Sequence, residues 1–232
     1  MAELKHKKQL FFDFDDTLWD FQKNSAHILE ELFYEYQLAD KLKTDYTNFE
    51  KTYQTINREL WKKYYKKEID KHHLRNHRFD KVFKAFGYTN YEENLEVTNH
   101  YLRRGPKGIH LKEGCIETLD YLKPNYQLHI ITNGFKESQD IKIEVCGLKS
   151  YFSQIIISEE HDLVKPEERI FRLAENFAGA KTEDCVMIGD SLESDIEGAL
   201  NAGWEAIYMA GNKDHNYGGR TIYKLEELKN LF

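Results

Sequence analysis

The stretch that decides the fold lies near the N-terminus and reads Leu10-Phe11-Phe12-Asp13-Phe14-Asp15-Asp16-Thr17-Leu18. Its apolar start is typical of a buried strand, and a strand's period of two places Asp13 and Asp15 on the same side of its C-terminal edge. Clustered carboxylates repel one another and are costly to bury unless a positive charge lies among them. The stretch therefore predicts a site for a cation and a phosphate or, alternatively, ordinary acidic turn residues after a strand.

The composition of the 232-residue chain excludes some classes of protein. Its net charge is −7, and 41% of its residues are hydrophobic, so it can bury a real core but lacks the basic footprint of a general nucleic-acid binder. Residues 20–107 carry 17 basic and 14 acidic side chains, whereas the remainder carries 16 basic and 26 acidic ones. This uneven distribution of charge suggests two modules.

Cysteine usage and apolar runs indicate the compartment. Cys115, Cys146 and Cys185 are far apart and show no CxxC spacing, so we expect neither a disulfide framework nor a cysteine-built zinc site. The apolar run after the basic N-terminus is broken at Asp13, and no run has the length of a transmembrane helix. We expect a soluble, cytoplasmic protein with no membrane partner.

A helical pattern follows the opening stretch for about eighty residues, with apolar side chains at three- and four-residue intervals. We expect helices over residues 26–36, 46–67, 74–86 and 92–102. Asn24 or Ser25 is the expected N-cap of the first. The run Arg104-Gly105-Pro106-Lys107-Gly108 is typical of a linker. Residues 19–107 are therefore predicted to be an all-helical domain inserted into a core domain of residues 1–18 and 108–232.

After the linker, short apolar runs alternate with helical segments. The expected strands are residues 127–131, 155–157, 186–188 and 206–208, and the expected helices are residues 113–122, 138–146, 167–177 and 193–202. Strands separated by helices of this length predict an α/β fold, with a Rossmann-like parallel sheet flanked by helices. Ligands of such sheets bind outside the carboxyl ends of the strands.

Polar side chains follow the predicted strands at these carboxyl ends. The first strand ends at Asp13, and the second is followed by Thr132-Asn133-Gly134. Lys165 follows the third strand, and Gly189-Asp190-Ser191 follows the fourth, with Asp195 one helical turn further on. Because these ends share one edge of a parallel sheet, we expect the side chains to meet in one site.

The residue types of this site suit phosphoryl transfer. Asp13 and Asp190 can bind Mg²⁺, which prefers oxygen ligands. Lys165 and the donors of Thr132, Asn133 and Gly134 can neutralise and orient a phosphate. A carboxylate can attack phosphorus, and a second carboxyl two residues further on can protonate the leaving oxygen and then activate water.

In this order and spacing the motifs resemble those of the haloacid dehalogenase superfamily of phosphohydrolases. The matching segments are the DxDxT motif at Asp13–Thr17, the Thr/Ser motif at Thr132, the lysine motif at Lys165 and the GDSxxxxD motif at Gly189–Asp195. The resemblance implies that Asp13 is the nucleophile and Asp15 the general acid and base. It also implies that Asp13, Asp190 and the backbone carbonyl of Asp15 bind Mg²⁺, and that Asp195 supports the metal's waters or Lys165.

The resemblance extends to substrate class. The helical insertion occupies the position of the family's C1 cap, which covers the active site as a mobile lid. The superfamily's true dehalogenases lack the second Asp, so Asp15 favours a phosphatase. The chain looks most like YjjG-type nucleotidases, which implies a small phosphorylated metabolite (a nucleoside 5′-monophosphate) as partner rather than DNA or RNA, and a monomer or weak homodimer.

Three alternatives stay open at this point. The same chemistry could act on phosphoglycolate or a sugar phosphate, as a phosphatase or a mutase, or the fold could serve a non-catalytic regulatory protein. Within the insertion, His72, His73 and His77 could bind a metal. A solvated basic face is the simpler interpretation of these histidines and of Arg75 and Arg78.

Overall fold

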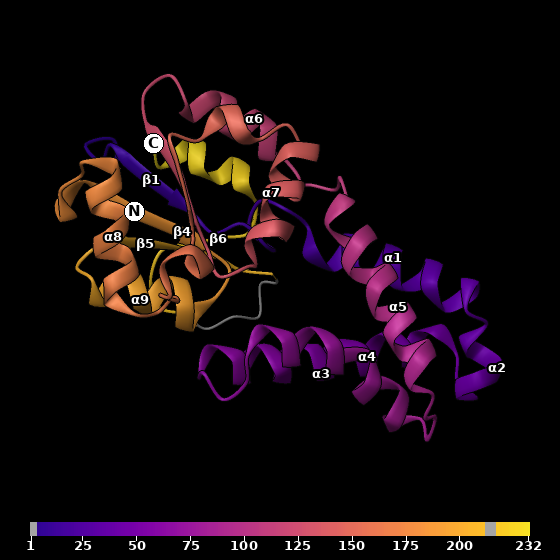
Figure 1. The fold of residues 1–232 in the computed structure, drawn as a ribbon. Helices are drawn as coiled ribbons and strands as arrows, with labels where there is room; N and C mark the ends of the chain where they lie inside the picture. Colours follow the sequence, from indigo (N-terminus) through magenta and orange to yellow (C-terminus); the bar gives the residue numbers. More distant parts are fainter. Residues whose placement is uncertain (1–3, 212–216) are drawn as a thin grey trace. The chain divides into compact units, whose positions relative to one another are not determined.

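The computed structural model describes residues 4–211 and 217–232 (Figure 1). The described part does not include residues 1–3 and 212–216, which belong to the predicted core domain. The chain divides into two compact units, one comprising Met1–Phe21 with Ile109–Phe232 and the other Gln22–Gly108. The first unit is α/β, and the second is helical throughout.

The α/β unit is built on a six-stranded sheet in the order β3-β2-β1-β4-β5-β6, with every neighbouring pair parallel. The strands are β1 Gln9–Phe12, β2 Gln127–Thr132, β3 Gln154–Ile157, β4 Cys185–Gly189, β5 Glu205–Met209 and β6 Thr221–Ile222. The predicted α/β fold with a parallel sheet is confirmed. The two-residue β6 was not predicted, because so short a strand has no periodic pattern.

Helices cover both faces of this sheet, as Figure 1 shows. They are α6 Cys115–Leu122, α7 Lys136–Val145, α8 Glu168–Ala178 and α9 Gly198–Asn201. Leu10 and Phe12 of β1 join a buried cluster with α6 and α7, whereas Phe11 joins a second cluster with α8 and α9. Because alternate residues point to opposite faces, a strand covered on both sides must be apolar throughout, which explains the run before Asp13.

The helix predicted over residues 193–202 is present, but its first half is a π-helix rather than an α-helix. A π-helical turn, Leu192–Glu197, precedes the short α9. The N–H of Ile196 donates to the carbonyl of Ser191, five residues earlier, at 3.2 Å. Asp195 lies within this wide turn, and its Oδ2 accepts the N–H of Ser191 at 3.0 Å. Wide turns of this kind are frequent at functional sites.

The helical unit contains α1 Phe21–Glu35, α2 Leu38–Leu42, α3 Tyr46–Tyr65, α4 Lys71–Ala85 and α5 Tyr91–Arg104. Asp45, Asp70 and Asn90 cap α3, α4 and α5, each accepting a backbone N–H in the first turn. The predicted cap of the first helix is wrong, because α1 begins at Phe21 and encloses Asn24 and Ser25 as buried residues. One apolar cluster from these helices forms the core of the unit.

Two further expectations concern cysteine and the membrane. All three cysteines are free thiols; Cys115 and Cys185 are buried and Cys146 is partly so. No helix in residues 4–211 and 217–232 is long and apolar enough to cross a membrane.

His129 is a buried titratable group in the middle of the sheet. It lies in β2, fully inaccessible to solvent, with Nε2 2.8 Å from Oε1 of Gln9 and its ring stacked on Phe11 at 4.5 Å between centroids. Burial lowers the pKa of His129 from 6.5 to about 4. Between these values the unfolded chain binds a proton that the folded chain does not.

We therefore expect His129 to lower the free energy of unfolding as the pH falls from about 6.5 to about 4, by about 1.4 kcal/mol per pH unit. His129→Leu should remove this part of the pH dependence, whereas the exposed His27→Leu should retain it. Urea denaturation followed by circular dichroism across this pH range measures both. Equal pH dependence in wild type and His129→Leu would contradict the assignment.

Candidate active site

Lys165, in the loop between β3 and α8, lies at the centre of the site with its side chain 1% exposed. Its Nζ lies 2.6 Å from Oδ1 of Asp13, 2.6 Å from Oδ1 of Asp195 and 2.8 Å from the carbonyl oxygen of Ile131. These three acceptors match the three N–H donors of an ammonium group. Burial alone would lower the pKa of Lys165, but the charges of Asp13 and Asp195 raise it, so the side chain stays cationic.

Neighbouring strands bring the acids to this lysine. Asp13 directly follows β1, and its N–H donates to the carbonyl of Ile188 in β4 at 2.8 Å. Asp190 directly follows β4, and Asp195 lies in the π-helical turn after it. Thr17 donates a long hydrogen bond, 3.5 Å, to Oδ1 of Asp190. The parallel pairing of β1 and β4 thus places acids from distant parts of the sequence side by side.

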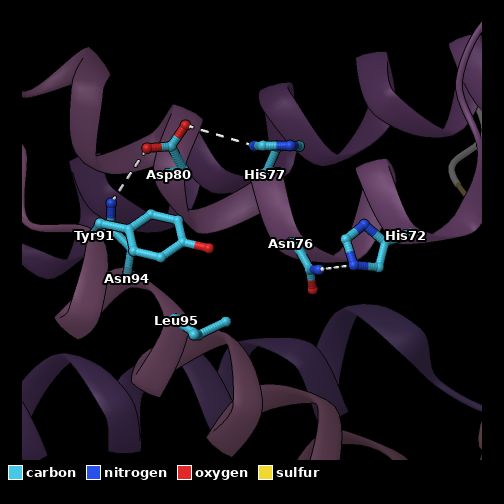
Figure 2. Close-up of a pocket in the computed structure, with 7 residues that line it drawn as sticks. All are labelled: His72, Asn76, His77, Asp80, Tyr91, Asn94 and Leu95. Carbon is cyan, nitrogen blue, oxygen red and sulfur yellow. Dashed lines mark hydrogen bonds and ion pairs between the residues drawn. The ribbon is translucent and has the colours of Figure 1, made fainter.

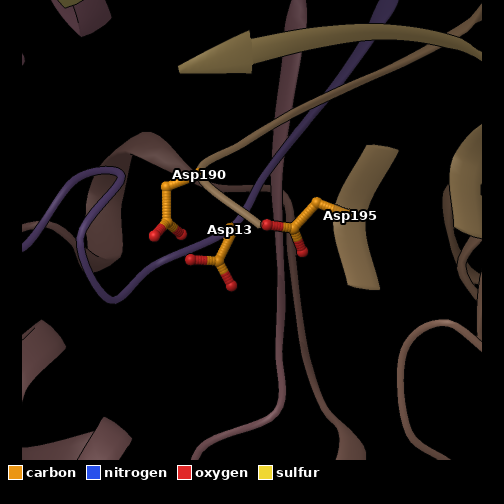
Figure 3. Close-up of side chains that lie close together, drawn as sticks. All are labelled: Asp13, Asp190 and Asp195. Atoms are coloured by element: carbon orange, nitrogen blue, oxygen red, sulfur yellow. The ribbon is translucent and has the colours of Figure 1, made fainter. Parts of the chain in front are cut away.

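The side chains of Asp13, Asp190 and Asp195 lie close together (Figure 3), and each offers one carboxylate oxygen within 4.8 Å of those of the other two. Burial raises the pKa of Asp13, and the repulsion of Asp195 adds to this against the opposing effect of Lys165. Burial and the charges of Asp13 and Asp195 raise the pKa of Asp190. One lysine does not balance three carboxylates, so the cluster has the charge and the oxygen donors to hold a metal cation.

Two glycines allow side chains of the site to pack directly against the backbone. A Cβ on Gly189 would lie 2.3 Å from Oδ2 of Asp195, and a Cβ on Gly134 would lie 2.3 Å from Nε2 of Gln139. Both distances are too short for any side chain. The absence of a Cβ at these positions is therefore what allows Asp195 and Gln139 to lie where they do.

Of the four residues predicted to bind phosphate, Thr132 ends β2, Asn133 and Gly134 follow it, and Lys165 lies in the loop after β3. Oδ1 of Asn133 accepts the backbone N–H of Lys165 at 2.9 Å, and its Nδ2 donates to the Lys165 carbonyl at 2.9 Å. The Asn133 side chain thus holds the main chain of Lys165, and any phosphate contact of Asn133 is expected from its backbone N–H. Oγ1 of Thr132 accepts the N–H of Gly134 at 3.2 Å.

The Asp15 side chain has different neighbours from the other acids. Nζ of Lys142 lies 2.6 Å from Oδ1 of Asp15, and Nε2 of Gln139 lies 2.9 Å from Oδ2. Both residues come from α7, and neither was predicted from the sequence. The sequence contained one signal for them. Gln139 and Lys142 lie on the inward face of the predicted helix, near Ile143, where the helical period predicts apolar residues.

Asp16 forms the turn between Asp15 and Thr17. Its φ is +63°, a left-handed conformation that Asp tolerates better than most residues. Its Oδ1 lies 3.0 Å from Nζ of Lys112, which also contacts Asp20 at 3.3 Å. This geometry fits a structural turn residue.

The comparisons with known proteins agree with this geometry. Residues 7–203 match the family model of the haloacid dehalogenase-like hydrolases. The chain belongs to this family. It is therefore a hydrolase, and the resemblance drawn from the strand-end motifs is confirmed.

Relatives are similar over nearly the whole chain. The chain is 34% identical to the pyrimidine 5′-nucleotidase PynA of Streptococcus pneumoniae, over 97% of this chain and 93% of PynA. It is 30% identical to the pyrimidine 5′-nucleotidase YjjG of Escherichia coli, over 96% of each chain. A crystal structure of the HAD-hydrolase YfnB of Bacillus subtilis bound to magnesium matches with a TM-score of 0.87 at 29% identity, covering 97% and 98% of the two chains.

Two histidines of the helical unit, His72 and His77, border a small pocket of ≈ 70 Å³ (Figure 2). Nε2 of His72 lies 2.8 Å from Nδ2 of Asn76, and Nδ1 of His77 lies 3.9 Å from Oδ2 of Asp80. Within the described part of the chain, the one group of three or more potential metal ligands contains no histidine. The expectation of a solvated face is wrong for Arg78, which is 6% exposed and donates to the Tyr53 hydroxyl at 3.0 Å.

We expect Lys165→Met to lower the free energy of unfolding by about 3–5 kcal/mol, because it leaves buried carboxylates without their cation. The matched control is Lys136→Met. Lys136 contacts Asp140 and Glu160 with its side chain 47% exposed, so its loss should change the free energy of unfolding little. Urea denaturation at pH 8 compares the two variants. Equal stabilities would show that the buried ammonium does not hold the acids together.

Proposed function

We propose that this hydrolase is a Mg²⁺-dependent phosphomonoesterase that forms an aspartyl-phosphate on Asp13, and that its substrates are nucleoside 5′-monophosphates. The observation that carries the proposal is the arrangement around Asp13. This carboxylate lies at a strand end between a buried lysine and two further acids, with Asp15 two residues away. The pyrimidine 5′-nucleotidases PynA and YjjG, similar over almost the whole chain, support the substrate class.

In the first half of the proposed reaction, a carboxylate oxygen of Asp13 attacks phosphorus. The bond between phosphorus and the ester oxygen breaks, and Asp15 gives a proton to that leaving oxygen. In the second half, a water oxygen attacks the phosphorus of the aspartyl-phosphate while Asp15 takes the water's proton. The bond from phosphorus to Asp13 then breaks, so that phosphate leaves and both acids return to their starting states.

The phosphate would be oriented by residues at the ends of β2 and β3. The hydroxyl of Thr132 and the backbone N–H of Asn133 can donate to its oxygens, and the N–H of Gly134 can do so once it leaves Oγ1 of Thr132, to which it donates in this structure. Lys165 lies beside the attacking carboxylate, so its charge opposes the repulsion between Asp13 and an anionic substrate. Asp195 is a positioning residue in this scheme, since it contacts Lys165 at 2.6 Å.

Mg²⁺ fits the acidic cluster because the cluster offers oxygen ligands and an excess of negative charge. Asp13, Asp190 and the backbone carbonyl of Asp15 are the residues that we propose hold it. A bound divalent ion would neutralise the carboxylates and the phosphate together. We further propose that the inserted helical domain is the family's C1 cap, whose residues select the substrate.

The test is phosphate release from a panel of nucleoside 5′-monophosphates, sugar phosphates and phosphoglycolate, with Mg²⁺ and with EDTA. We expect the highest kcat/KM with pyrimidine nucleotides, complete loss of activity in EDTA, and its return when Mg²⁺ is added in excess. Preference for phosphoglycolate or a sugar phosphate would overturn the substrate class. Release of phosphate from none of them would favour a non-catalytic binding protein.

We expect Asp13→Asn to lower kcat by at least about 10⁴-fold, because an amide cannot serve as the nucleophile. The control is Asp140→Asn on the surface of α7, whose side chain is 53% exposed and which should keep wild-type turnover. Circular dichroism checks that both variants are folded. Substantial activity in folded Asp13→Asn would rule out the aspartyl-phosphate.

A further inference from the structure

Two polar side chains of α7 bind the Asp15 carboxylate from its buried side. Lys142 donates to Oδ1 at 2.6 Å and Gln139 to Oδ2 at 2.9 Å, so each oxygen has its own donor. Gln139 is fully buried and the Lys142 side chain is 9% exposed, whereas the Asp15 side chain is 30% exposed. The donors therefore lie behind the carboxylate, and its exposed side remains free to meet a ligand.

The ammonium of Lys142 also lies over the ring of Trp19. Nζ lies 4.2 Å from the centroid of the Trp19 ring, within the range of a cation–π interaction. Trp19 is itself buried in the loop after β1, where its N–H donates to the carbonyl of Phe14 at 2.9 Å and its carbonyl accepts the N–H of Asp16 at 2.8 Å. The loop that contains Asp15 thus also supplies the surface that holds Lys142 against it.

Gln139 connects Asp15 to the phosphate-binding segment. Its Nε2 donates to Asp15 and also to Oγ1 of Thr132, at 2.6 Å. A Cβ on Gly134 would displace this amide, as the 2.3 Å separation shows. One amide group therefore fixes the distance between the carboxylate at the end of β1 and the hydroxyl at the end of β2.

We infer that Lys142 and Gln139 are positioning residues that hold Asp15 in the orientation required for proton transfer. The inference rests on the proposed function, in which Asp15 gives a proton to the leaving oxygen and takes one from water. A carboxylate with one fixed donor on each oxygen cannot rotate about its terminal bond without breaking a contact. The competing interpretation is a purely structural ion pair that attaches α7 to the first loop.

Lys142→Met should lower kcat on nucleoside monophosphates by about 10²-fold with KM little changed, because misplacing a catalytic group by about 1 Å costs that much. Lys142→Arg keeps a cation at this position and should restore most of the loss. Lys136→Met, on the exposed side of the same helix, is the matched control and should keep wild-type kcat. Thermal melting checks that each variant is folded at the assay temperature.

A double-mutant cycle separates the two interpretations. If Lys142 acts through Asp15, Lys142→Met should add no further loss to Asp15→Asn. Should Lys142→Met not fold, Gln139→Met, which removes the donor to the other oxygen, takes its place in the same cycle. The inference would be overturned if Lys142→Met lowered the kcat of Asp15→Asn by the same factor as it lowers the wild-type kcat. It would also be overturned if Lys142→Met had wild-type kcat.

The leaving group supplies a second readout. The 4-nitrophenolate ion leaves without a proton, so the first turnover of Lys142→Met should be near the wild-type rate with 4-nitrophenyl phosphate but slow with a nucleoside monophosphate. Equal losses on both substrates would overturn the inference. Failure of the proposed function would look different, because Asp15→Asn would then match wild type or the wild-type enzyme would release no phosphate.

Discussion

The contact of one buried ammonium group with two carboxylates is the interaction on which the site depends. Lys165 reaches Asp13 and Asp195 at 2.6 Å each, in surroundings where an unpaired charge would cost several kcal/mol. Other residues position the groups that make this contact. Asn133 bonds both main-chain polar groups of Lys165, and Gly189 leaves room for the Asp195 carboxylate. The phosphate chemistry proposed for this site requires the same arrangement. Buried acids can bind a cation there only if the free-energy cost of burying their charges is offset, and the contact with Lys165 offsets it.

The topology of the sheet explains why the site forms beside β1. The chain runs from β1 to β2 and β3 on one side and then returns to β4 on the other side of β1. In open α/β sheets the crevice for ligands opens where the strand order reverses in this way, at the carboxyl ends. Asp13 lies at that point, with Thr132 on one neighbouring strand and Asp190 beyond the other. The position of Asp13, the nucleophile that we propose, thus follows from the strand order.

Much of this could be predicted from sequence, and the exceptions have physical causes. Strand ends are local signals, so the residues at the carboxyl ends of β1, β2 and β4 were predicted correctly as neighbours. The short helix α2 was missed because Gln37 and Lys43 adopt left-handed φ angles of +52° and +51° at its ends without a glycine to mark them. The π-helical turn was missed because the preference for a wide turn at Asp195 arises from contacts with Ser191 that form only in the folded chain.

Asp13 and Asp15 show why identity and spacing alone do not assign roles. Strand geometry places both at one edge of the sheet, and in the sequence only the resemblance to the family's DxDxT motif distinguishes them. The fold separates them through their partners, because Asp13 is buried against Lys165 and two acids, whereas Asp15 contacts Lys142 and Gln139 and stays partly exposed. A nucleophile must remain fixed beside the metal and the phosphorus, but a proton carrier must reach both the leaving oxygen and water. Two different surroundings, supplied by the loop before α8 and by the inner face of α7, fit the two roles that we propose for these acids, within three residues of chain.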